Sequence, residues 1–186
     1  MIEAALATLV GLFPCVLIVT KSPARFRFLK GRQVRIVRDR FRESHSLGGI
    51  YSGLCRAKTR HAFVCGCDMP LLAPELVRAL WRARAGRAAV VPRFGGSLQP
   101  LCAVYARRCL KPIRRLIRLR QFRVQGIFEK VAVRVVSEQK TRKADKKGLS
   151  FLDVDTRRDY REAKRRSRGQ RRMYYRMYYK NLCKRK

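Results

Sequence analysis

The feature that most constrains the fold is an unbroken apolar run at residues 15–19, Cys-Val-Leu-Ile-Val. A run without polar alternation is typical of a strand that is covered on both faces. Predicted elements alternate through the first ninety residues: helix 4–12, strand 15–19, strand 34–37, helix 49–57, strand 62–65 and a helix from Pro74. Such alternation is typical of βαβ units with right-handed crossovers. We therefore predict an α/β fold, three-layered and Rossmann-like, with a mainly parallel sheet.

The second half of the chain continues the alternation less regularly. We predict strands at 88–91, 101–105 and 131–136, an Arg-rich amphipathic helix at 109–119, and a polar, charged loop at 140–147. A length of 186 residues fits one ordinary domain, which we place at residues 1–163. Residues 164–186 form a basic Tyr/Arg-rich tail, predicted to be helical or disordered. The tail either stacks on bases and binds phosphates or has no role of its own.

The charge of the chain is strongly unbalanced, with 46 Lys and Arg against 12 Asp and Glu. The tail contributes 11 basic residues and no acidic one, which leaves 35 basic against 12 acidic residues in the body. A basic field of this strength favours anionic partners such as nucleotides, nucleic acid or anionic lipid. The charge alone does not distinguish among these partners. A general arginine bias without a dedicated partner explains the charge equally well.

Seven cysteines are scattered along the chain: Cys15, Cys55, Cys65, Cys67, Cys102, Cys109 and Cys183. Their odd number and apolar surroundings indicate reduced, buried thiols in a cytoplasmic protein rather than a disulfide framework. The pair Cys65 and Cys67 is spaced too closely for a zinc knuckle. No apolar run reaches the roughly 18–20 residues that a membrane span requires. We therefore expect a cytoplasmic protein without a membrane segment.

Polar residues follow the predicted strands where a parallel sheet would open to a ligand. Asp39 follows the second strand, a loop at residues 46–49 precedes a helix, and Asp68 follows the third strand. Glycines in the loop allow close approach of a ligand to the backbone, and the helix start offers N–H donors to an anion. Loops of this kind also make ordinary tight turns, so the loop alone is a weak signal.

Carboxylates at strand ends are the candidate metal ligands. Asp68 offers the hard oxygen donor that Mg²⁺ prefers when it bridges phosphates, although a helix or turn cap is an equal alternative. Asp153 and Asp155 would point the same way on an extended segment and could join Asp68 around one metal. Alternatively, one of them simply begins the last helix. A fourth segment, residues 99–105, has no chemistry that can be inferred from its residues alone.

Six segments, taken in order, resemble the molybdenum cofactor guanylyltransferases, which lie within the wider group of sugar-nucleotide pyrophosphorylase-like transferases. Those proteins show a V-L-I-V-T-N strand end, a strand followed by Asp, a G-P-L-x-G-I-x-x-G-L loop, a C-D-M-P turn, an H-P-L-x-A-x-Y segment and an N-x-N-T-P-E-D-L ending. The matching segments here are residues 16–21, 34–39, 46–54, 67–70, 99–105 and 153–160. The resemblance covers residues 2–163, and the C-D-M-P turn is its most specific part.

The resemblance implies the transfer of GMP from Mg-GTP to the phosphate of molybdopterin, with release of pyrophosphate. It implies that Asp68 is the catalytic carboxylate and a nucleotide contact that holds Mg²⁺, and that Asp155 is a second metal contact. Asp39 is expected to bind the nucleotide, and Leu47, Gly48 and Gly49 are expected to border the base.

The departures from the pattern are as informative as the matches. The family begins with a strand and a loop of the form L-A-G-G-x-S-x-R-M-G-x-D-K, whose amides and Lys bind the phosphates, and no segment here matches it. We therefore expect weak or absent catalysis. Asp153 and Asp155 replace Asn, a variation of relatives that transfer other nucleotides. Two alternatives follow: a nucleotidyltransferase for another nucleotide or acceptor, and a basic nucleic-acid-binding protein on the same fold.

Overall fold

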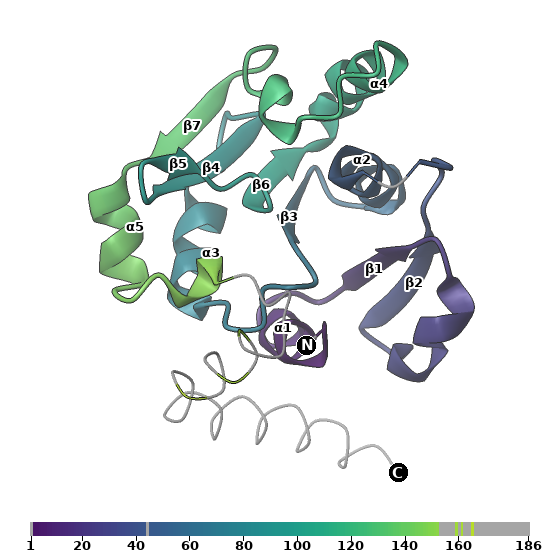
Figure 1. Ribbon diagram of the computed structural model, residues 1–186, viewed down its shortest axis with the longest axis horizontal. Helices are drawn as coiled ribbons and strands as arrows, with labels where there is room; N and C mark the ends of the chain where they lie inside the picture. The colour runs from purple at the N-terminus through teal and green to yellow at the C-terminus, as the bar shows by residue number, and fades with distance from the viewer. Residues whose placement is uncertain (1, 44, 153–158, 160, 162–164, 166–186) are drawn as a thin grey trace.

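The computed structural model describes residues 2–43, 45–152, 159, 161 and 165. Figure 1 shows its strands running through the middle of the molecule, with helices on either side. The helices are α1 (Ile2–Val10), α2 (Ser46–Arg56), α3 (Pro74–Arg82), α4 (Leu110–Arg118) and α5 (Glu138–Ala144). The strands are β1 (Val16–Thr20), β2 (Val34–Arg38), β3 (His61–Cys65), β4 (Ala89–Phe94), β5 (Ser97–Leu98), β6 (Cys102–Ala106) and β7 (Val133–Val136). Short 3-10 turns are η1 (Pro23–Leu29), η2 (Arg107–Cys109), η3 (Val124–Ile127) and η4 (Leu149–Phe151).

The strands are divided between two sheets. The smaller sheet is the parallel pair β1–β2, with Val16 beside Val34 and Thr20 beside Arg38. The larger sheet has the order β3-β6-β4-β5, and β7 also pairs with β4. Within the described residues, β1 and β3 make no backbone pairing with each other, so each has one unpaired edge. The predicted α/β class is confirmed, but the sheet is divided.

Strand direction in the larger sheet differs from a purely parallel arrangement at β5 and β6, which both run antiparallel to β4. β6 pairs antiparallel with both β3 and β4, so β3 and β4 run the same way, and β7 runs parallel to β4. β6 follows the short β4–β5 hairpin, in which the chain reverses at Gly95 and Gly96 with positive φ values of 58° and 75°. The reversal therefore comes from a two-residue turn, without a helical crossover.

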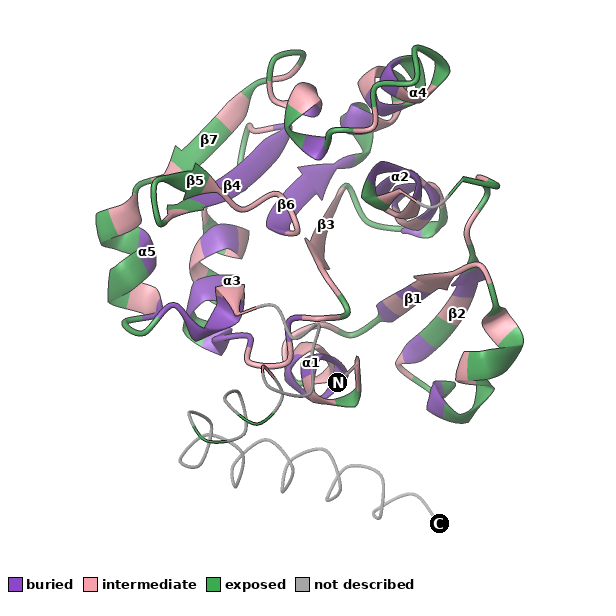
Figure 2. Ribbon diagram, in the orientation of Figure 1, coloured by how far each residue is buried: buried purple, intermediate pink, exposed green. Residues whose placement is uncertain are grey.

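The larger sheet is covered on both faces, as the apolar runs predict. Alternate residues point to opposite sides: Ala103 and Tyr105 of β6 pack with α2 and α4, whereas Cys102 and Val104 pack with α3. These four side chains are all fully buried. Figure 2 shows the contrast with β3, which is only half-buried along its whole length.

The smaller sheet has a separate apolar cluster formed by Leu6, Val16, Ile18, Leu29 and Val34. Helix α1 connects it to the rest of the molecule, because its Ala5 belongs to the α3 cluster of the larger sheet.

The structure contradicts one prediction for the remaining segments and does not describe the residues of the others. The polar loop predicted at 140–147 is wrong: residues 138–144 form α5, in which Ser137 caps the first turn and Glu138 pairs with Arg142 one turn later at 2.7 Å. The segment is mainly polar, a composition that a surface helix shares with a loop, and this is why the helix was not predicted. Asp153, Asp155 and nearly all of the tail lie outside the described residues, so the predictions made for them stay predictions.

Candidate functional site

Asp39 directly follows β2, where the smaller sheet ends. Its backbone N–H donates to the carbonyl of Thr20 at 2.9 Å, which aligns the ends of β1 and β2. Its carboxylate oxygen Oδ1 accepts from the Ser52 hydroxyl at 2.8 Å and from the Phe41 N–H at 3.2 Å. The carboxylate is half-buried and fixed in orientation, with lone pairs still available to a ligand.

Ser52 was not expected among the site residues. Its side chain is fully buried in α2, and its hydroxyl accepts from the Arg40 N–H at 3.0 Å while donating to Asp39. It thus fixes the segment after β2 to α2. A sequence signal was present, because a hydroxyl between the buried residues Ile50 and Leu54 requires a polar partner.

The loop before α2 is held by a histidine cap. His45 Nδ1 accepts the Gly48 N–H at 2.8 Å. A Cβ at Gly48 would lie 2.8 Å from His45 Cε1 and 3.0 Å from Phe41 Cδ2, so only glycine fits there. A Cβ at Gly49 would meet nothing within 4 Å, so there is space beside that residue, whose N–H donates to the His45 carbonyl at 3.5 Å. Leu47 is fully buried in the core, so only its main chain can border a base.

A distant segment closes over this loop. The Phe122 ring stacks on the His45 ring with a centroid distance of 4.4 Å and an interplanar angle of 19°. Nearby, Arg120 forms a 3.0 Å ion pair with Glu43, although both side chains are well exposed. The segment after α4 therefore contacts the loop before α2, which the sequence did not predict.

Asp68 lies in the turn that follows β3. Gly66 in the same turn donates its N–H to the carbonyl of Leu101 at 3.0 Å. The Asp68 carboxylate folds back over it, so that a Cβ at Gly66 would lie 2.1 Å from Oδ1. Met69 and Leu72 anchor the turn in the core, and Asp68 itself is half-buried. The turn thus presents one carboxylate at the end of a fixed strand.

The predicted residues form two groups. Asp39 and the loop at residues 46–49 are joined through Ser52 and α2, whereas no hydrogen bond links Asp68 to either of them. Among the described residues, no group of three or more His, Cys, Asp or Glu side chains is arranged to hold a metal ion. A cation at Asp68 would therefore depend on substrate phosphates and water for its other ligands, as Mg²⁺ commonly does.

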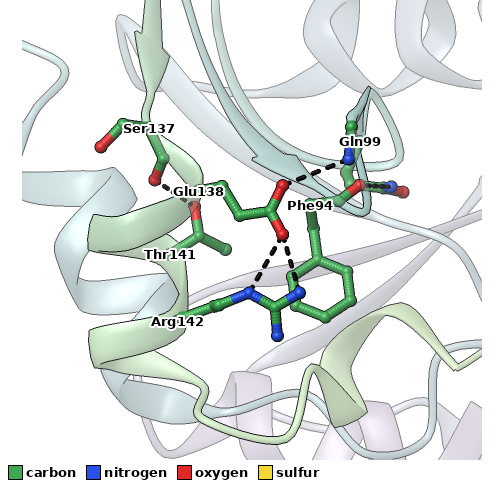
Figure 3. Close-up of polar contacts among 7 residues, drawn as sticks. Phe94, Gln99, Ser137, Glu138, Thr141 and Arg142 are labelled. Carbon is green, nitrogen blue, oxygen red and sulfur yellow. Dashed lines mark hydrogen bonds and ion pairs between the residues drawn. The ribbon is translucent and has the colours of Figure 1, made fainter.

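The segment at residues 99–105 has a structural role. Gln99 donates its side-chain N–H to the carbonyl of Phe94 at 3.2 Å, and the Tyr105 hydroxyl donates to the carbonyl of Pro100 at 2.8 Å. Burial raises the pKa of Tyr105 well above its ordinary value, so it stays a neutral donor. Figure 3 shows Gln99 bonded to Phe94, whose ring lies beneath the Arg142 guanidinium at 4.6 Å.

The six cysteines in the described residues are free thiols, as expected. Burial raises the pKa of Cys65 to about 12 and that of Cys109 to about 11, so both remain protonated at neutral pH. The expectation of burial is wrong for Cys15 and Cys67, which are exposed because each lies just outside a strand.

Comparisons with known proteins identify the family of the chain. The family described as MobA-like NTP transferase domain matches residues 1–143. A probable molybdenum cofactor guanylyltransferase from Pelotomaculum thermopropionicum is 34% identical over 70% of this chain and 64% of its own length. A molybdenum cofactor guanylyltransferase from Desulfosudis oleivorans is 33% identical over 63% of this chain and 59% of its own length. The chain thus spans roughly three fifths of these two relatives.

A solved structure extends the likeness to the fold. Molybdopterin-guanine dinucleotide biosynthesis protein A from Archaeoglobus fulgidus superimposes with a TM-score of 0.71, covering 86% of this chain and 83% of that one at 24% identity. Within residues 2–43 and 45–152, no helix is both long and apolar enough to cross a membrane. The cytoplasmic location stays a prediction.

Proposed function

The chain belongs to the MobA-like NTP transferase family, and from this membership we propose that it transfers GMP from GTP to the phosphate of molybdopterin. We assign the activity to residues 1–163. In the reaction, an oxygen of the molybdopterin phosphate attacks the α-phosphorus of GTP. The bond from that phosphorus to the bridging oxygen breaks, and pyrophosphate leaves with the electron pair.

The observation that best supports this proposal is the junction at Ser52. It holds the Asp39 carboxylate beside the helix whose first turn contains Gly48 and Gly49. A carboxylate can accept hydrogen bonds from ribose hydroxyls or base N–H groups, while the positive end of the helix dipole at the start of α2 favours a base oxygen or a phosphate. A nucleotide placed here would meet both kinds of partner at once.

Asp68 is proposed to hold the metal. Its half-buried carboxylate is a hard oxygen donor, and a single donor suits Mg²⁺ that also binds triphosphate oxygens. Bound there, Mg²⁺ would neutralise charge on the phosphates during the displacement. Asp155 is proposed as a further metal contact. The protein's own contribution is to hold the nucleotide in line with the attacking phosphate.

Binding and turnover need separate measurements, because nucleotide binding and phosphoryl transfer test different residues. Thermal shift with GTP and CTP in Mg²⁺ should give the larger stabilisation with GTP. Pyrophosphate release with molybdopterin and Mg-GTP should then fall by at least about a hundredfold in Asp68→Asn. Glu75→Gln is the matched control, because Glu75 is an exposed acid on α3 that pairs with Arg78 at 3.4 Å.

Two results would contradict the proposal. Equal stabilisation by CTP and GTP would favour the alternative, a transferase for another nucleotide. Equal activity in wild type and Asp68→Asn would remove the proposed metal ligand.

A further inference from the structure

Acidic and basic residues are unevenly distributed along the chain: long segments contain many basic residues and no acidic one. Between Glu75 and Glu129 lie 53 residues with 13 Lys or Arg and no acidic residue. Eight of these basic residues fall in η2, α4 and the segment between α4 and η3. The segment from Ser46 to Cys67, which contains α2, is also free of acidic residues. Since α2 packs against α4, the two acid-free segments are neighbours in space.

Helix α4 orders part of this charge into a row. Lys111, Arg114, Arg115 and Arg118 are all exposed. At 3.6 residues per turn they fall within an arc of about 100°, opposite the buried residues Ile113 and Leu116. The row is about 10 Å long at 1.5 Å rise per residue. Among the described residues, none of the four cations forms an ion pair.

The row continues onto the end of α2. Arg107, at the start of η2, donates its N–H to the carbonyl of Arg60 at 2.9 Å and its guanidinium to that of Ala57 at 2.6 Å. These bonds hold the turn after α2 beside the beginning of α4. The last residue of α2 and this turn expose Arg56, Lys58 and Arg60. We call the seven residues Arg56, Lys58, Arg60, Lys111, Arg114, Arg115 and Arg118 the basic face.

We propose that the basic face binds the phosphate backbone of nucleic acid. Successive cations at positions i and i+4 lie about 6 Å apart along α4, a spacing suited to a polymer with closely repeated phosphates. Arginine forks match phosphate geometry, and neutralised phosphates release counterions. This function is separate from the proposed GMP transfer, because among the described residues none of the seven forms an ion pair with Asp39 or Asp68.

A membrane surface fits the basic face less well. A helix that lies on a bilayer buries its apolar side among the lipids. In α4 that side is already occupied, because Ile113 is fully buried and Leu116 is 4% exposed in the protein core. Contact with an anionic lipid surface would then rest on charge alone. The basic face therefore suits a polyanion that stays in water.

The test compares full-length variants with matched charge. The α4 variant carries Lys111→Gln, Arg114→Gln, Arg115→Gln and Arg118→Gln, which keep helix propensity. The control carries Arg25→Gln, Arg27→Gln, Lys30→Gln and Arg32→Gln, four exposed positions of η1 and the turn after it. Both remove three Arg and one Lys. Circular dichroism and the melting temperature establish that both remain folded.

The measurement is fluorescence anisotropy with a short labelled DNA duplex over a series of salt concentrations. The slope is that of the logarithm of the association constant against the logarithm of the salt concentration. In the α4 variant we expect its magnitude to decrease by about 3 to 4, because each lost phosphate contact removes about 0.9. The affinity near 0.1 M salt should fall by on the order of a hundredfold or more. The control should keep its slope within about 1 of wild type.

Three results would overturn the proposal. Equal losses in both variants would mean that net charge alone drives binding. No loss in the α4 variant, with a large loss in a third variant carrying Lys164→Gln, Arg165→Gln, Arg166→Gln and Arg168→Gln, would move the interaction to the tail. Wild-type binding to phosphatidylserine vesicles without binding to the duplex would assign the basic face to a membrane.

Discussion

The two sheets of this protein contain similar residues but are buried differently. In the larger sheet, Val91 of β4 and Val104 of β6 are fully buried. In the smaller sheet, the best-covered β1 residues, Val16 and Ile18, still expose 9% and 8%. The difference comes from partners: β4 and β6 have strands on both sides and helices on both faces, whereas β1 pairs only with β2 in the described chain. Apolar composition alone therefore does not determine how well a strand is covered.

Helix α2 packs against both sheets, and the candidate nucleotide site lies where α2 contacts the end of the smaller sheet. Its Leu47, Ile50 and Leu54 belong to the core of the larger sheet. Its Ser52 holds Asp39 of the smaller sheet, and a Cβ at Gly53 would touch Val19 of β1 at 3.4 Å. Asp39 therefore depends on the well-packed sheet for its position, although it belongs to the less well-packed one.

The largest expected effect tests the difference in packing directly. Ile113→Ala, in the larger core, should cost about 4 kcal/mol of unfolding free energy, and Ile18→Ala, in the smaller cluster, only about 2 kcal/mol. The reason is that Ile113 is fully buried, so its cavity cannot be relieved by solvent. Urea denaturation of both variants measures this. A larger cost for Ile18→Ala would reverse the comparison.

The second prediction tests the register between β3 and β6. Cys65 lies opposite Cys102, and the Gly66 bond to Leu101 makes this a non-hydrogen-bonded pair, for which Cα atoms lie about 4.5 Å apart. In a variant that keeps Cys65, Cys102 and Cys109 and has every other cysteine changed to Ser, the oxidant diamide should join Cys65 to Cys102. This disulfide should add about 3 kcal/mol to the free energy of unfolding.

Because burial raises the pKa of Cys65 to about 12, the crosslinking rate should rise about tenfold per pH unit above neutrality. Peptide mass spectrometry under non-reducing conditions identifies the bond. Cys109 donates its thiol to the Ala88 carbonyl at 3.2 Å and serves as an internal control that should remain free. A bond from Cys65 to Cys109 would refute the register.

The third prediction tests the coupling through α2. Ser52→Ala leaves the Asp39 carboxylate without its hydroxyl donor, which should cost about 1–2 kcal/mol. Amide exchange in β1 and β2 should accelerate, whereas exchange in β4 and β6 should not change. Ser97→Ala, at an exposed position of β5, is the control. Acceleration in all four strands would mean that the two sheets unfold as one unit.

The smallest effect concerns the outer end of the larger sheet. The Gly96 N–H and the Arg142 guanidinium lower the pKa of Glu138 below its ordinary value of 4.5. The carboxylate therefore stabilises the fold above pH 4.5, and this contribution disappears as the pH falls through the lowered pKa. The small difference in melting temperature between wild type and Glu138→Gln at neutral pH should vanish in acid. A difference that persists at low pH would exclude the charge as its cause.

Much of this architecture could be predicted from local patterns. Unbroken apolar runs gave β1, β3 and β4 within one or two residues at their starts, because such runs can be covered only inside a layered sheet. The direction of β6 was not predictable, since it follows from pairing across the sheet. The positions of Asp39, Gly48 and Asp68 at element ends could be anticipated, whereas the contacts made by Ser52 and Phe122 depend on helices distant in sequence.

In the part of the chain that the structure describes, β1 and β3 each have an unpaired edge, which has a consequence for handling the protein. An unpaired strand edge presents N–H and C=O groups to any extended chain that approaches it. The opposite edge of the smaller sheet carries Arg35 and Arg38, whose exposed charges discourage strand addition there. Concentrated solutions should therefore self-associate through β1 and β3 first, so a stock kept dilute, or at a pH that preserves the high net charge, should remain monodisperse for longer.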